Sequence, residues 1–144
     1  EMSDMVGKEI MNSDFPDDSL HHEEPSSEYV PGGYCLLDIG DTLMSTYYII
    51  RKLGWGISST VWLCWNMVAS GYVAIKVMKG SDQFLEDAKK EVRFLEMADA
   101  NNHDYQKYVI KCLDYFLVEG QNGKHACIVF EVGGLTLGEF GARN

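Results

Sequence analysis

Two charged residues lie where the surrounding sequence is apolar, and they are the first candidates for chemistry. Lys76 lies within the apolar run 73–77, and Glu91 shares one face of a predicted helix with Ala88 and Leu95. An unpaired buried charge is costly, so each residue needs a partner of opposite sign. An ion pair between Lys76 and Glu91 would satisfy both and could present the lysine to phosphate groups. A purely structural ion pair, or a Glu91 that reaches solvent from the helix edge, fits the same pattern.

A glycine-rich segment, residues 54–59 (GWGISS), lies between two predicted strands. A dinucleotide-binding G-x-G-x-x-G turn would lie between a strand and a helix, with an acidic residue about 20 positions further on. Here Ser59 takes the place of the third glycine and residue 74 is alanine. The segment instead predicts a hairpin turn whose backbone N–H groups could approach phosphates, with Val61 able to cover an adenine ring. A structural turn between strands would have much the same sequence.

The sequence contains four widely spaced cysteines with no C-x-x-C pair: Cys35, Cys64, Cys112 and Cys127. This spacing is typical of reduced thiols in a cytosolic or nuclear protein, rather than of a zinc site or a disulfide framework. We expect these cysteines to be buried as small hydrophobic residues. His21 and His22 have no cysteine or further histidine nearby, so we expect them to face solvent and assign no metal ligand to this chain.

Five strands and one helix are predicted to position these residues. Aromatic and β-branched residues predict the strands, glycines mark the turns, and apolar residues at helical spacing predict the helix. The strands are expected at 47–53, 60–65, 72–78, 108–118 and 125–132, and the helix at 82–98 with Asp82 as its cap. Glycines at 54, 56 and 71 and a hairpin through 120–123 would connect the strands. The expected fold class is α+β, with a five-stranded antiparallel sheet and one helix.

Charge is unevenly distributed along the 144 residues, whose formal net charge is −10. Residues 1–31 carry nine acidic side chains against the single Lys8, and they hold all three prolines and few apolar side chains. We therefore predict an acidic disordered tail over 1–31 and one folded domain over 32–144. The tail is either a solvated segment or a segment that attracts a basic partner.

The composition also disfavours several classes of function. A nucleic-acid-binding surface needs clustered lysine and arginine, which this acidic chain lacks, so we expect no direct nucleic-acid binding. The longest apolar runs are far shorter than the roughly 20 residues that cross a bilayer. The N-terminal residues lack the basic start and apolar region of a secretory signal. We expect neither membrane insertion nor export.

Several segments of the sequence together resemble the N-terminal lobe of a protein kinase. They are 53–56 (LGWG), 59–65 (STVWLCW), 73–76 (VAIK), Glu91 and 129–132 (VFEV). The tryptophan in the glycine segment and the VWLCW run are most similar to the SR-protein kinases, which phosphorylate serine in Arg-Ser-rich splicing factors. The segments 32–34 (GGY) and 38–41 (DIGD) also resemble that family. The resemblance covers about residues 29–137 and implies a protein-kinase-like N-lobe.

The resemblance implies a role for each matching residue. The glycine segment would cover the phosphates of ATP, and Lys76, paired with Glu91, would hold the α- and β-phosphates. Apolar residues would enclose the adenine, with Phe130 as gatekeeper and the hinge beginning at Glu131. The residues implied to act in catalysis are Lys76 and Glu91, and those implied to bind the nucleotide are Leu53, Gly54, Trp55, Gly56, Ser59, Val61, Ala74, Lys76, Phe130, Glu131 and Val132.

The sequence contains no H-R-D, D-F-G or A-P-E motif. Because the protein ligands for the metal ions lie on those motifs, we expect an N-lobe without its C-lobe, inactive as a 144-residue chain. The family resemblance implies a serine/threonine kinase that uses ATP and Mg²⁺, acts on Arg-Ser-rich proteins, is monomeric, and works in the cytoplasm and nucleus. The alternative is a natural truncated product that binds nucleotide, or partners of the full kinase, without turnover.

Overall fold

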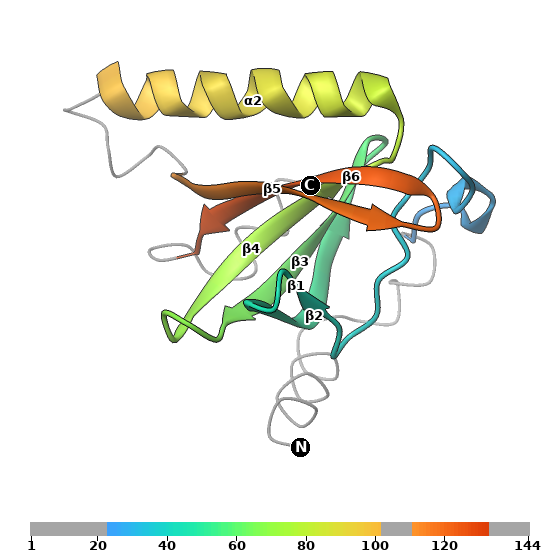
Figure 1. Cartoon of the computed structure of the whole chain (residues 1–144), viewed down its shortest axis with the longest axis horizontal. Helices are drawn as coiled ribbons and strands as arrows, with labels where there is room; N and C mark the ends of the chain where they lie inside the picture. The colour runs from blue at the N-terminus through green and yellow to red at the C-terminus, as the bar shows by residue number, and fades with distance from the viewer. Residues whose placement is uncertain (1–22, 102–110, 133–144) are drawn as a thin grey trace.

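A computed structural model describes residues 23–101 and 111–132 of the chain (Figure 1). Six strands form one sheet in the order β1-β2-β3-β4-β6-β5, and every neighbouring pair is antiparallel. The long helix α2 packs against β6, β5 and β4. In chain order the elements are the 3-10 helix η2 (Ser26–Glu28), β1 (Thr42–Leu43), β2 (Tyr47–Trp55), β3 (Ser59–Asn66), β4 (Gly71–Met78), α2 (Asp82–Asn101), β5 (Cys112–Gly120) and β6 (Gly123–Glu131).

All five predicted strands are present, with their ends shifted by a few residues, and the sheet gains β1 as a sixth. Residues 108–110 of the fourth predicted strand lie outside the described residues. The short β1 joins β2 through a tight turn in which the Thr46 N–H donates to the Leu43 carbonyl. Met44 and Ser45 both have positive φ in this turn, as a type I′ turn requires. Because that turn normally contains glycine or asparagine, the sequence did not predict it.

The helix begins at Asp82 as predicted and ends three residues later than predicted, at Asn101, whereas its cap and the start of the glycine turn differ from the prediction. Ser81, not Asp82, precedes α2, because its carbonyl accepts the first helical hydrogen bond from the Leu85 N–H at 3.3 Å. Strand β2 was predicted to end before the glycines, but it continues through Gly54 and Trp55, which pair with Val61 and Thr60 of β3. Only residues 56–58 therefore form the turn.

The sheet has two apolar faces, because side chains along each strand alternate between them. We call one the helix face; its buried members are Ile50, Leu53, Val61, Leu63, Ala74, Met78, Ala88 of α2, Ala126, Ile128 and Phe130. We call the other the closed face; its buried members are Cys35, Leu43, Tyr47, Ile49, Trp62, Cys64, Val73, Ile75, Val77, Cys127 and Val129.

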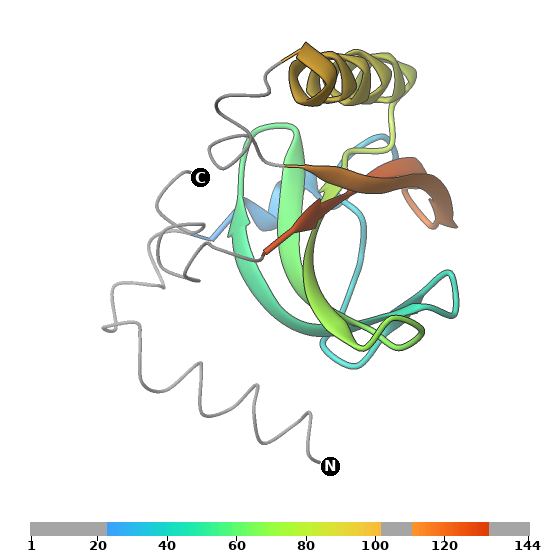
Figure 2. The same cartoon turned by 90° about the vertical axis from the view of Figure 1, so that its left-hand side faces the viewer.

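Curvature of the sheet covers the closed face (Figure 2). Strands β2 and β5 are far apart in the strand order, yet Tyr47 of β2 stacks on Phe116 of β5 with ring centroids 5.7 Å apart. The Tyr47 hydroxyl also donates to Asp114 of β5 at 3.0 Å. The sheet therefore folds back on itself, and its concave side needs no helix to exclude water.

The four cysteines are all reduced, as predicted. Cys35, Cys64 and Cys127 are buried on the closed face, where burial raises the pKa of Cys64 to about 12. Cys112 departs from the prediction because it is only partly buried, at the first position of β5. Within the described ranges, no helix is long and apolar enough to cross a membrane.

The folded unit includes residues that the sequence assigned to the acidic tail. Glu24 is 8 % exposed and pairs with Lys52 of β2, and the Tyr29 hydroxyl donates to the same carboxylate. Residues 24–31 are therefore part of the domain, and they are attached by charges rather than by an apolar pattern. The prediction for residues 1–22 lies outside the described residues.

Candidate nucleotide-binding site

The predicted ion pair between Lys76 and Glu91 is present. The Lys76 Nζ lies 3.1 Å from both carboxylate oxygens of Glu91. Strand β4 places the lysine opposite Val61 of β3 and Ile128 of β6, and alternation along β4 directs it to the helix face together with Ala74 and Met78. Helix α2 brings Glu91 over the same face. One strand and one helix therefore fix the two ends of the pair.

The pair is more exposed than the sequence predicted. The side chain of Lys76 is 25 % exposed and that of Glu91 is 32 % exposed. The apolar run around Lys76 is buried, but α2 is the only helix over this face in the described part of the chain. The lysine side chain is consequently held in position by Glu91 while part of it stays exposed to solvent.

The apolar residues assigned to adenine lie together on the helix face. Leu53, Val61, Ala74 and Phe130 belong to one core cluster, and Val132 packs against it. The strand register explains this, because Ala74 lies opposite Leu63 of β3 and Phe130 of β6. These residues are adjacent to Lys76, two positions from Ala74 on the same face of β4. An apolar surface therefore lies directly beside a cation.

The glycine turn connects the end of β2 to the start of β3, the two strands that contribute Leu53 and Val61. Its ends are joined by a hydrogen bond from the Gly56 N–H to the Ser59 carbonyl at 2.8 Å, and the intervening Ile57 is 83 % exposed. A Cβ added at Gly56 would meet no atom within 4 Å, and the residue does not have a positive φ. Nothing in the described structure requires glycine there, so this position is suited to close approach of another molecule.

Not every predicted site residue lies in the turn or in the apolar cluster. Ser59 is 4 % exposed and pairs with Met78 within the β3–β4 ladder, so its backbone belongs to the strand. Glu131 is exposed at the end of β6 and donates its N–H to the Lys111 carbonyl at 3.2 Å. The predicted hinge therefore starts where the last strand ends. Its continuation at 133–136 lies outside the described residues.

The residues present fit a nucleoside phosphate better than a metal ion. The described parts of the chain contain no group of three or more His, Cys, Asp or Glu side chains that could hold a metal ion. Glu91, which the sequence assigned to the site, is already paired with Lys76. What the site offers is a fixed cation, an accessible turn and an apolar surface. An antiparallel sheet, one helix, a glycine turn and a strand lysine paired with a helix glutamate together define the N-terminal lobe of a protein kinase.

Comparison with known proteins identifies the family within that class. The chain is 39% identical over 122 residues to the human protein named SRSF protein kinase 3, an alignment that covers 83% of this chain. It is 42% identical over 123 residues to the serine/threonine-protein kinase spk-1 of Caenorhabditis elegans, and 40% identical over 119 residues to protein kinase dsk1 of Schizosaccharomyces pombe. No family model matches the chain. The chain belongs to the SR-protein kinase family.

The chain spans only a small part of these relatives. The alignments cover 21% of SRSF protein kinase 3, 12% of spk-1 and 22% of dsk1. The similarity therefore concerns one lobe-sized region. The activities of the complete relatives therefore cannot be assigned to this region alone.

Sequence reasoning missed the residues that hold the glycine turn from behind. The Tyr34 hydroxyl donates to the Gly56 carbonyl at 2.6 Å, and the Lys79 N–H donates to the Ser58 carbonyl at 2.8 Å. Lys79 also pairs with Glu28 at 3.2 Å. The segment 32–34 was noted as part of the family resemblance, but no local pattern indicated that its tyrosine reaches a turn 22 residues away.

Proposed function

We propose that this region binds ATP on the helix face, as the nucleotide-binding lobe of a serine/threonine protein kinase. The observation that carries the proposal is the position of Lys76. Its ammonium is held 3.1 Å from both oxygens of Glu91, its side chain is 25 % exposed, and it lies next to the apolar cluster of the helix face.

Each part of the site has a separate task in this proposal. Leu53, Val61 and Ala74 form part of the apolar cluster against which a purine ring would pack. Lys76 supplies a fixed positive charge for phosphate oxygens, and Glu91 keeps the flexible lysine side chain in one orientation. The turn at 56–58 places backbone groups over the phosphates. Bound Mg²⁺ would neutralise charge on the phosphates during transfer, and its protein ligands are not among these residues.

For the complete kinase we propose Arg-Ser-rich splicing factors as substrates, with action in the cytoplasm and nucleus as a monomer. The names of the relatives support the substrate class, because one of them is called an SRSF protein kinase. Arginine-rich substrates carry positive charge, and this chain has a net charge of −10. Charge complementarity would favour their encounter at low ionic strength.

A binding measurement tests the nucleotide proposal. We would titrate the 144-residue chain with MgATP and separately with adenosine, using isothermal titration calorimetry. The expected result is that both bind and compete with each other, and that MgATP binding weakens when Lys76 is replaced by methionine. Lys124→Met is the matched control, because Lys124 lies on the β5–β6 hairpin, is 60% exposed and only loosely contacts Glu119. A chain that binds neither ligand would overturn the proposal.

A further inference from the structure

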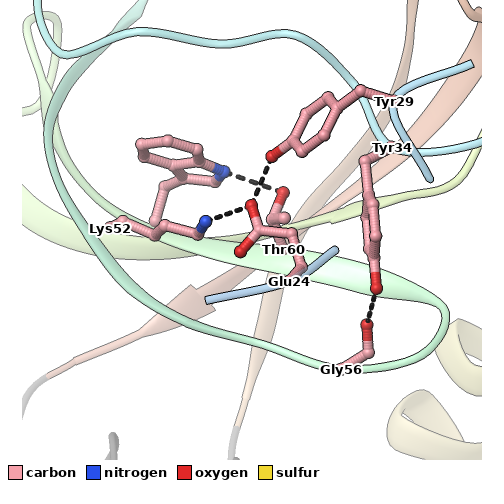
Figure 3. Close-up of polar contacts among 7 residues, drawn as sticks. Glu24, Tyr29, Tyr34, Lys52, Gly56 and Thr60 are labelled. Carbon is pink, nitrogen blue, oxygen red and sulfur yellow. Dashed lines mark hydrogen bonds and ion pairs between the residues drawn. The ribbon is translucent and has the colours of Figure 1, made fainter. Parts of the chain in front are cut away.

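The residues before the sheet form a strap, defined here as residues 24–35, that runs behind the glycine turn (Figure 3). Its own side chains attach it at three points. Glu24 accepts hydrogen bonds from Lys52 of β2 and from Tyr29, Glu28 pairs with Lys79, and Tyr34 donates to Gly56. All three points lie close to the turn end of β2 and the end of β4, so the strap is fastened where the sheet would meet phosphates.

Within the strap, the Tyr34 side chain bonds directly to the turn. Its side chain is almost completely buried, with 2% of the residue exposed, and the Lys79 Nζ lies 4.5 Å above its ring. The hydroxyl donates to the Gly56 carbonyl at 2.6 Å. Burial and the nearby charges of Glu24 and Glu28 raise the pKa of Tyr34, so the hydroxyl keeps its proton at neutral pH and can donate.

The backbone around Tyr34 is held rigidly by a junction of close-packed glycines. The Gly32 N–H donates to the Asn122 carbonyl at 2.7 Å, and the Gly80 N–H donates to the Gly33 carbonyl at 2.9 Å. A Cβ at Gly33 would lie 1.9 Å from the Glu28 carbonyl oxygen, and one at Gly80 would lie 2.4 Å from that of Asn122. No side chain can enter this junction without moving the backbone.

Asn122 closes the junction from the β5–β6 turn. Its side-chain amide donates to the Tyr34 carbonyl at 2.7 Å. The strap, the end of β4 and the β5–β6 turn are thus fixed to one another, and the phenol of Tyr34 extends from that fixed point to the Gly56 carbonyl. The junction is a rigid base, whereas the turn itself projects beyond the sheet.

We propose that Tyr34 is a positioning residue for the glycine turn: it holds the Gly56 carbonyl from behind, so that the neighbouring backbone N–H groups are arranged for phosphate before nucleotide binds. This inference rests on the proposed function. Pre-arrangement reduces the ordering that binding would otherwise require, so it strengthens affinity for a ligand that contacts the turn. Adenosine lacks phosphates, and its affinity does not depend on the turn.

The test compares Tyr34→Phe with Tyr47→Phe in the 144-residue chain. Each variant removes one hydroxyl from a buried tyrosine, and the Tyr47 hydroxyl bonds to Asp114 on the closed face, away from the turn. We would measure the dissociation constants for MgATP and adenosine. Tyr34→Phe is expected to weaken MgATP binding by about 3- to 10-fold and to leave adenosine unchanged, while Tyr47→Phe changes neither.

A second measurement keeps the inference separate from the proposed function. Amide hydrogen exchange without nucleotide should be faster at residues 56–59 in Tyr34→Phe than in wild type, and unchanged there in Tyr47→Phe. Equal MgATP affinity in Tyr34→Phe and wild type, or tighter binding in the variant, would overturn the positioning role although nucleotide binding stands. If wild type binds neither ligand, the proposed function fails, and the positioning role fails with it whatever the exchange rates.

Discussion

The two faces of the sheet are built from the same strands, but they are covered in different ways. The closed face is covered by curvature of the sheet itself, where Tyr47 of β2 stacks on Phe116 of β5. The helix face is covered by α2 alone within the described residues, and it contains Lys76 beside its apolar cluster. Because curvature of the sheet covers the closed face, the helix face can remain only partly covered. A ligand site requires such a partly covered face.

The largest expected effect is on stability, and a matched pair of isoleucines tests whether both faces contribute equally to it. Ile75 on the closed face and Ile128 on the helix face are both fully buried and lie on adjacent strands. Replacing either one by alanine should lower the free energy of unfolding by about 2–5 kcal/mol, because each leaves a cavity. Urea denaturation followed by tryptophan fluorescence measures this.

The milder pair Ile75→Val and Ile128→Val sharpens the same comparison while keeping the chain folded. Each substitution should lower the free energy of unfolding by about 0.5–1.5 kcal/mol. Only Ile128→Val is expected to weaken MgATP binding, because Ile128 lies opposite Lys76 in the β4–β6 ladder. Equal effects of the two valine variants on nucleotide affinity would remove the functional distinction between the faces.

The next largest effect concerns the lysine. We would graft residues 23–132 onto the C-terminal lobe of a related SR-protein kinase and compare wild type with Lys76→Met. The variant should lose about 10²- to 10³-fold in kcat/KM, because a fixed charge on the phosphates is removed. It should stay folded, since methionine fits an apolar strand. A variant that melts at a lower temperature but keeps its activity when folded would show a purely structural ion pair.

Glu91→Gln in the same chimera should have a smaller effect, about 10-fold in kcat/KM. The amide oxygen can still accept a hydrogen bond from Lys76, but it no longer supplies the negative charge that holds the ammonium. Steady-state kinetics at saturating peptide substrate would measure the loss. Lys89, on the exposed side of α2, pairs with Glu86 and offers the control Glu86→Gln, which should leave kcat/KM unchanged.

The smallest effect is a pH dependence that arises from the closed side of the sheet. His125 is fully buried, its Nδ1 lies 2.8 Å from the Met78 carbonyl oxygen, and its Nε2 has no hydrogen-bond partner among the described residues. Burial lowers the pKa of His125 below its ordinary 6.5, although the contact with Met78 partly opposes this.

The direction of this pH dependence follows from the state, folded or unfolded, that binds the proton at the higher pH. As pH falls through about 6.5, the unfolded chain takes up the proton before the folded one, so stability present above that pH is lost progressively down to the folded pKa. Urea denaturation at pH 7.5 and 5.5 should show this loss in wild type. His125→Gln should be less stable overall but should lose the histidine's share of the pH dependence, and an unchanged pH dependence in the variant would contradict the assignment.

The sequence was sufficient to predict the elements whose patterns are local. Alternating and helical spacing located five strands and the helix. The cost of burying single charges indicated an ion pair between Lys76 and Glu91, although a Glu91 that reaches solvent fitted the same pattern. The two-residue β1 was missed, because its turn uses Met44 and Ser45 at positive φ in place of the usual glycine or asparagine.

Contacts between distant segments could not be predicted from local patterns. The boundary at residue 32 followed composition, whereas Glu24 is kept in the fold by Lys52, 28 residues away. Burial alone would raise the pKa of Glu24, but hydrogen bonds from Lys52 and Tyr29 outweigh burial and lower it. The partial exposure of Lys76 was also missed, because a strand's apolar neighbours do not reveal how much of a face a helix covers.

The central proposal is that nucleotide binds to the helix face, next to Lys76 and the glycine turn. A titration of the ¹⁵N-labelled chain with MgATP, followed by backbone amide chemical shifts, tests this most directly. We expect the largest shifts at 54–59, Lys76 and 131–132, with small shifts on β1 and at the centre of β5. Saturable shifts concentrated on β1 and β5, or no shifts at millimolar MgATP, would contradict the account.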